Sequence, residues 1–135
     1  MIKALAHVCF TVRDLEASEA FYRNQLGLAP GFDFINDQGE RFGVYLHLAD
    51  RSFLELFQGE ADKPAAGQSY RHFCLEMDDL EAEVARLRAA GVQVTDPHLG
   101  SDHSWQAWLS DPDGNRIELH CYTPESKQGP LLESR

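Results

Sequence analysis

Apolar and polar side chains alternate along residues 3–12, and this alternation is typical of a β-strand with one buried face. The apolar side chains of that face are Ala6, Val8, Phe10 and Val12. His7 lies on the opposite face. Asp14 is placed to cap a helix that ends at Gly27, a residue that adopts positive φ without strain. Further alternating segments predict a βαβββ order, with strands at residues 31–36, 41–49 and 52–58.

The same pattern occurs a second time. Residues 7–17 align without gaps on residues 72–82, and both segments begin with His and end with Asp-Leu-Glu-Ala. A second helix is predicted between Asp79 and Gly91. Three more strands are predicted, at residues 92–97, 104–110 and 115–122, and the turn 111–115 joins the last two. A repeat of about sixty residues indicates two modules with the same fold.

The predicted class is α+β, with two tandem βαβββ modules that form a curved mixed sheet around a metal site. We predict a single domain over residues 1–122. Its parts are module one (1–58), a linker with small residues (59–69) and module two (70–122). Residues 123–135 are polar and lack periodicity, so this tail is expected to fray or to wrap around a neighbour.

Two histidines and two glutamates occupy equivalent positions of the two modules. His7 and His72 lie in the first strand of each module, and Glu55 and Glu118 lie in the last. A single strand histidine is more often hydrogen-bonded than metal-bound, but each glutamate is flanked by apolar residues, where an unpaired carboxylate costs several kcal/mol. If the modules face each other about a pseudo-twofold axis, the four side chains converge. Two imidazoles and two carboxylates suit one divalent cation, such as zinc, nickel, cobalt, manganese or iron(II).

Composition narrows the set of partners. The chain has 135 residues and a formal net charge of -10, with 12 basic residues that do not cluster, so nucleic acid is an unsuitable partner. No apolar run is long enough to span a bilayer, so we expect a cytoplasmic protein with no membrane partner. Cys9, Cys74 and Cys121 lack CxxC spacing and are expected to be reduced core residues.

The sequence resembles the vicinal oxygen chelate superfamily, which contains glyoxalase I, methylmalonyl-CoA epimerase, extradiol dioxygenases, and fosfomycin- and bleomycin-resistance proteins. The resemblance covers residue 3 to about residue 122 and rests on the His7 strand, Phe21-Tyr22, Phe53-Leu54-Glu55-Leu56, Tyr70-Arg71-His72 and residues 111–119. The ligand set at positions 7, 55, 72 and 118 resembles that of bacterial-type glyoxalase I. The dioxygenases of this superfamily use two His and one Glu, and its bleomycin-binding members lack the metal residues.

This resemblance implies a metal-dependent lyase or isomerase, with nickel, cobalt or zinc favoured and manganese or iron(II) compatible. A small substrate with two neighbouring oxygens would chelate the metal, and a proton would be transferred through an enediolate. Glu118 is assigned as the principal base and Glu55 as the second acid or base. The substrate pocket is expected to include Phe53, Phe57, Trp105 and Arg116, although strand alternation lets only one of Trp105 and Trp108 face it. A homodimer is expected.

Two positions depart from the glutathione-dependent pattern. Thr11 and Gly59 stand where those enzymes carry an Arg and an Asn that hold the γ-glutamyl group. The substrate is therefore open between a glutathione hemithioacetal and another small hydroxycarbonyl compound. Two other functions also stay open: an iron(II) extradiol-type dioxygenase that uses His7, His72 and Glu118, with Tyr122 or His120 as acid–base help, and a non-catalytic drug- or metabolite-binding protein.

Overall fold

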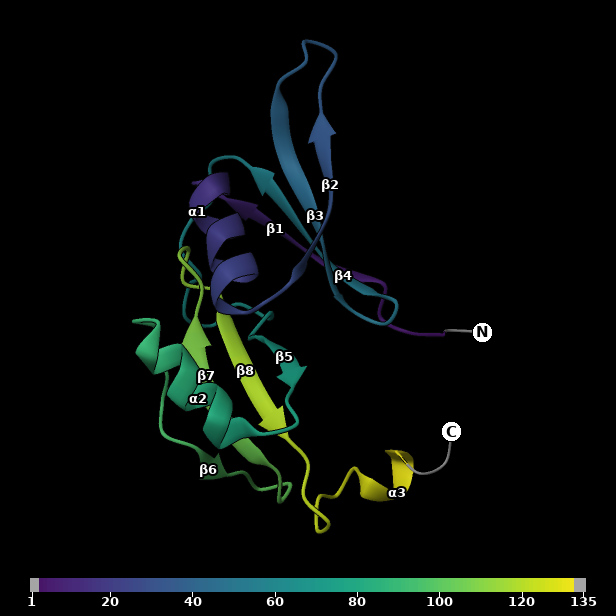
Figure 1. The fold of residues 1–135 in the computed structure, drawn as a ribbon, viewed down its shortest axis with the longest axis vertical. Helices are drawn as coiled ribbons and strands as arrows, with labels where there is room; N and C mark the ends of the chain where they lie inside the picture. Colours follow the sequence, from purple (N-terminus) through teal and green to yellow (C-terminus); the bar gives the residue numbers. More distant parts are fainter. Residues whose placement is uncertain (1–2, 133–135) are drawn as a thin grey trace. The chain divides into compact units, whose positions relative to one another are not determined.

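The computed structural model describes residues 3–132, and the chain divides into two compact units, residues 1–63 and 64–135. Unit one has one four-stranded sheet in the order β1-β4-β3-β2. Its elements are β1 (His7–Val12), α1 (Leu15–Ala20), a π-helical turn η1 (Phe21–Gln25), β2 (Ala29–Ile35), β3 (Arg41–Ala49) and β4 (Ser52–Gln58). β1 is parallel to β4, the other pairs are antiparallel, and α1 packs on β3 and β4 (Figure 1).

Unit two repeats this arrangement with the strand order β5-β8-β7-β6. Its elements are β5 (Phe73–Glu76), α2 (Leu80–Ala89), β6 (His98–Leu99), β7 (Trp105–Ser110), β8 (Arg116–Cys121) and α3 (Gly129–Leu132). β5 is parallel to β8, and α2 packs on β7 and β8 (Figure 1). The predicted α+β class with two βαβββ modules is confirmed.

The two faces of each sheet have different roles because their side chains alternate. In β4, Leu54 and Leu56 are buried beneath α1, whereas Phe53, Glu55 and Phe57 project from the other face. In β8, Ile117 and Leu119 are fully buried, and Glu118 projects from the opposite face. Each fully buried aliphatic side chain contributes about 1.5–3 kcal/mol through removal of apolar surface from water. The core therefore fixes the strands that carry the two glutamates.

Local caps also agree with the predicted repeat. Asp14 accepts a hydrogen bond from the backbone N–H of Ala17 at 2.9 Å, and Asp79 accepts one from Ala82 at 3.0 Å. Gly27 and Gly91, which follow the two helical segments, have φ values of 78° and 81°. These features give both helices the same start and the same end.

The strand expected at residues 92–97 does not form, which corrects that prediction. Thr95 donates its backbone N–H to the Trp108 carbonyl at 2.9 Å, but its Oγ1 accepts the Trp108 N–H at 2.9 Å in place of a backbone carbonyl. Pro97 has no N–H to continue a ladder, and the observed strand β6 is confined to two residues. The first strands are also shorter than expected, since β1 begins at His7 and β5 at Phe73.

The tail does not fray over its first part. Lys127 donates its backbone N–H to the Asp102 carbonyl at 2.9 Å, and Thr123 Oγ1 donates to the His103 carbonyl at 2.7 Å. Residues 133–135 lie outside the described part of the chain. Between residues 3 and 132 no helix has the length and apolar character needed to cross a membrane.

Candidate metal centre

The first His–Glu pair lies on the face of unit one that is opposite α1. Parallel pairing of β1 and β4 aligns Cys9 with Glu55, and His7 precedes Cys9 by two residues on the same face. The His7 Nε2 atom lies 3.8 Å from Glu55 Oε2, and His7 Nδ1 lies 3.4 Å from the Tyr45 hydroxyl. The Glu55 side chain is 17% exposed and that of His7 44%, so the pair is reachable from solvent.

The second pair occupies the equivalent place in unit two and is tighter. His72 Nε2 lies 2.9 Å from Glu118 Oε2, and the Glu118 side chain is only 9% exposed. The imidazole of His72 also packs edge-on against the Trp108 indole, with ring centroids 4.8 Å apart. The structure thus brings together the predicted ligands within each module.

The donor atoms fit the geometry that a divalent ion requires. With metal–ligand bonds of about 2.1 Å, adjacent ligand atoms on an octahedral ion lie about 3.0 Å apart and opposite ones about 4.2 Å. The Nε2–Oε2 distance of 2.9 Å in unit two matches that of adjacent ligands, whereas the 3.8 Å in unit one lies between the two values. Imidazole and carboxylate are the usual ligands of zinc, nickel, manganese and iron. Each pair therefore supplies two donor atoms of the kinds that such ions bind.

Several aromatic side chains lie on the Glu55 face of unit one. Tyr45, which pairs with Glu55 across β3 and β4, stacks on Phe53 and on Phe32 at centroid distances of 5.0 and 4.9 Å. Phe57 stacks on Phe42 at 5.7 Å. The two predicted pocket residues Phe53 and Phe57 therefore lie on the glutamate face within a larger group of rings.

Trp108, and not the predicted Trp105, lies on the Glu118 face of unit two. Trp105 pairs with Cys121, on the face opposite Glu118, whereas Trp108 pairs directly with Glu118. This register corrects the assignment of Trp105, since strand alternation permits only one of the two to face the ligand pair. The predicted Arg116 shares the Glu118 face, and its guanidinium lies 4.4 Å from the centre of the Trp108 ring.

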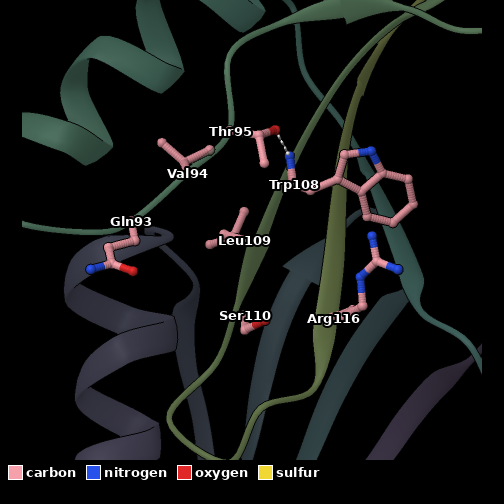
Figure 2. Close-up of a pocket in the computed structure, with 7 residues that line it drawn as sticks. All are labelled: Gln93, Val94, Thr95, Trp108, Leu109, Ser110 and Arg116. Atoms are coloured by element: carbon pink, nitrogen blue, oxygen red, sulfur yellow. Dashed lines mark hydrogen bonds between the residues drawn. The ribbon is translucent and has the colours of Figure 1, made fainter. Parts of the chain in front are cut away.

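A cavity of about 520 Å³ lies next to this tryptophan (Figure 2). Trp108 and Arg116 line one side of it, and Figure 2 shows the bond from the Trp108 N–H to Thr95 Oγ1 on the other side. Trp108 lines this cavity and also contacts His72, but neither His72 nor Glu118 lines it.

The cysteines are not core residues, which corrects that expectation. Cys9 and Cys74 are exposed free thiols on the two glutamate faces. Partial desolvation, followed by the nearby Glu55 carboxylate, raises the pKa of Cys9 to about 11. Desolvation and then the charges of Glu118, Asp102 and Glu76 raise the pKa of Cys74 to about 12. Both thiols are therefore protonated at neutral pH without a bound metal, although thiolate is the form that ligates metals.

Sequence reasoning gave little weight to His120, which the structure buries beside Glu118. His120 Nδ1 lies 3.1 Å from Glu118 Oε1. Cys74, Glu118 and His120 each offer a ligand atom, and these three atoms lie within 4.8 Å of one another. The only signal in the sequence was the spacing of two residues from Glu118, which places both side chains on one face of β8.

Two βαβββ modules with a His–Glu pair in each define a class of two-module α+β proteins with candidate metal ligands in both halves. The family model of the Glyoxalase/Bleomycin resistance protein/Dioxygenase superfamily matches residues 4–119, and the chain belongs to this superfamily. The resemblance drawn from the ligand-bearing strands is thereby confirmed.

Relatives within the superfamily carry several different names. The chain is 29% identical to a glutathione transferase FosA of Serratia marcescens, over 89% of this chain and 82% of the relative. It is 30% identical to an ethylmalonyl-CoA/methylmalonyl-CoA epimerase of Cereibacter sphaeroides, over 85% and 93% of the two chains. It is also 30% identical to a lactoylglutathione lyase of Haemophilus influenzae, over 85% and 90%.

A solved structure adds a protein that binds a ligand. TnmS3, an antibiotic binding protein from Streptomyces sp. CB03234, superposes with a TM-score of 0.73 at 29% identity, over 90% of this chain and 98% of that one. The relatives therefore include both enzymes and a binding protein, and the choice between these functions depends on the site.

Proposed function

We propose that the chain is a metal-dependent lyase or isomerase of the glyoxalase I type. One divalent metal, with nickel, cobalt or zinc favoured, would be held by His7, Glu55, His72 and Glu118. The observation that carries the proposal is the repeated His–Glu pair, with Nε2–Oε2 distances of 3.8 and 2.9 Å at equivalent positions of the two modules. In both modules the pair lies on the face of the sheet opposite the helix, where the His7 and His72 side chains are 44% and 34% exposed.

The substrate class is a small hydroxycarbonyl compound or hemithioacetal with two neighbouring oxygens. When bound, the metal would hold these oxygens and stabilise the negative charge left by removal of a carbon-bound proton. Glu118 would loosen as a ligand and take up that proton, and Glu55 would serve as the second acid or base. Phe53 and Phe57, which flank Glu55 on its face of the sheet, would offer apolar contacts to the bound substrate.

The test combines metal analysis with an assay for proton transfer. Purified protein should contain about one divalent metal per four-ligand site. It should act on a panel of hydroxycarbonyl compounds and hemithioacetals in the absence of oxygen. Activity that requires oxygen and iron(II) would support the dioxygenase that uses His7, His72 and Glu118, in which Tyr122 or His120 acts as acid or base.

A second candidate function is binding without catalysis, favoured by the ring cluster on unit one. Phe32 and Phe42 are 54% and 39% exposed and join the stack around Tyr45 and Phe57. Such a surface suits a flat aromatic drug or metabolite. Tight binding of an aromatic antibiotic to metal-free protein, together with no turnover of any hydroxycarbonyl compound, would favour this function.

A further inference from the structure

His120 is a buried polar residue that the proposed reaction does not use. It is 6% exposed, and its ring lies between two carboxylates of unit two. Nδ1 is 3.1 Å from Glu118 Oε1, and Nε2 is 3.8 Å from Asp102 Oδ2. Since a carboxylate oxygen only accepts, Nδ1 carries the proton and donates to Glu118. Within the described residues, Nε2 makes no hydrogen bond.

Asp102 is held in place from its other side. The Gln128 side chain donates from Nε2 to Asp102 Oδ2 at 2.7 Å, and the backbone N–H of Ser104 donates to Oδ1 at 3.2 Å. The Gln128 bond, supported by the bond from Ser104, lowers the pKa of Asp102. The carboxylate that faces His120 is therefore ionised and fixed.

The tail residues fix this arrangement to the fold. Ser126 is buried, and its hydroxyl lies 2.7 Å from that of Ser104. Ser126 Oγ also accepts the backbone N–H of Thr123 at 2.8 Å. These bonds hold residues 123–128 against residues 102–104 and so place Gln128 beside Asp102. A series of hydrogen bonds therefore runs from the tail to Asp102, and Asp102 Oδ2 lies 3.8 Å from His120 Nε2.

Module one has no histidine at the position equivalent to His120. The repeat aligns His120 with Phe57, so the position two residues after Glu55 carries a phenyl ring. The Glu55 carboxylate consequently has no equivalent imidazole on its own strand, and its contact with His7 is longer than that between His72 and Glu118. The two glutamates therefore differ in how firmly they are held.

We propose that His120 is a positioning residue, which donates from Nδ1 to Glu118 Oε1 and so leaves Oε2 presented beside His72. This inference rests on the proposed function, since it concerns how Glu118 meets the metal. Ligating carboxylates that are themselves hydrogen-bonded bind more tightly, and loss of such a partner costs 10–100-fold in metal affinity or activity. A carboxylate held by one oxygen also stays in place when the other oxygen takes up a proton.

The test uses the full chain, stripped of metal and titrated with Co²⁺ by calorimetry and by visible absorption. His120→Phe installs the residue of module one and should lower Co²⁺ affinity by about 10–100-fold and change the cobalt spectrum. His120→Asn places an amide N–H where Nδ1 lies and should restore affinity to within a few-fold of the wild type. His120→Gln directs its amide toward Asp102 and should resemble the Phe variant. His98→Phe, at an exposed histidine of β6, is the matched control and should bind like the wild type.

Two results would overturn the positioning role alone. One is unchanged affinity, spectrum and kcat in His120→Phe; the other is equal loss in the Asn and Phe variants, which would show that donation at Nδ1 is irrelevant. Unfolding temperatures measured without metal identify a variant that fails to fold. If His120→Phe fails to fold, the Co²⁺ affinities of His120→Asn and His120→Gln are compared instead, and equal affinities would overturn the positioning role. If the wild type binds no Co²⁺ and Glu118→Gln gives the same null titration, the proposed function fails, and the positioning role fails with it.

Discussion

Glu55 and Glu118 are equivalent by sequence but not by environment. Glu118 is nearly buried, with His72 at one oxygen and His120 at the other. Glu55 is more exposed, and its closest imidazole nitrogen is 3.8 Å away. A four-ligand site depends on both residues, whereas a three-ligand dioxygenase leaves the Glu55 position without a role.

Replacement of Glu55 tests this difference directly. Glu55→Gln removes one negative ligand and should weaken metal binding by at least tenfold and abolish lyase activity. Metal content by mass spectrometry and initial rates give the two readouts. The matched control is Glu60→Gln, which changes an exposed carboxylate just beyond β4. Gln58 cannot serve as a control position, because its side chain accepts the Leu15 N–H and donates to the Arg13 carbonyl. Full metal content and full turnover in Glu55→Gln would favour the three-ligand site.

Thr11 and Gly59 bear on the substrate. A Cβ added at Gly59 would lie 3.0 Å from Thr11 Cγ2, so the two positions are neighbours at the end of β1. The superfamily resemblance places the groups that hold the γ-glutamyl end of glutathione at these positions. The Thr11 side chain carries no charge, and Gly59 has no side-chain amide for that purpose.

Glutathione adducts should therefore be poor substrates. A buried polar group left without its partner costs about 1–3 kcal/mol, and more if charged. The value of kcat/KM on the methylglyoxal–glutathione hemithioacetal should fall roughly one to three orders of magnitude below that of a dedicated glyoxalase I. Steady-state kinetics beside thiol-free hydroxycarbonyl compounds measure the difference. A kcat/KM for the glutathione adduct near 10⁴–10⁸ M⁻¹s⁻¹ would contradict this prediction. Arg116 would then be the candidate cation that holds the γ-glutamyl group.

The helices and strands show which parts of the fold a sequence can predict. Alternation and helix caps act between residues close in the chain, so β3, β4 and both helix starts were predicted almost to the residue. The strand prediction for residues 92–97 was wrong because the Thr95 side chain, 13 residues away in the chain, accepts the Trp108 N–H in place of a backbone carbonyl. The His–Glu pairs were visible because they repeat. His120 has no counterpart in module one, and the contact with Asp102 that distinguishes it is made by a loop without periodicity.

The loop at residues 100–104 and the tail should show a pH-dependent coupling. Because the folded state lowers the pKa of Asp102, its contribution to stability is present above the unfolded value of about 3.9 and is lost as the pH falls through the lower folded value. Asp102→Asn should reduce the free energy of unfolding by about 1 kcal/mol at pH 7. Urea denaturation at pH 7 and pH 3 should show this difference shrinking at the lower pH. An equal difference at both values would exclude the charge as its cause.

The chain as a whole leaves surfaces that a second copy could cover. Each unit has one four-stranded sheet with two edge strands, and edges with unpaired backbone groups favour further association. Large apolar side chains are exposed on β2, where Phe32 and Ile35 are each 54% accessible. Closed symmetric pairing is the commonest way for soluble chains to bury such surfaces.

We therefore predict a homodimer at micromolar concentration, measured by sedimentation of the metal-loaded protein. A stable monomer with full metal content would remove the dimer. Mixed dimers can then show which chains build each site, because Glu55→Gln damages only unit one and Glu118→Gln only unit two. If each site takes one unit from each chain, equal mixing restores up to about a quarter of wild-type activity, since half of the dimers are mixed and one of their two sites is intact. If each chain supplies both of its own pairs, every site contains one damaged ligand and mixing restores no activity.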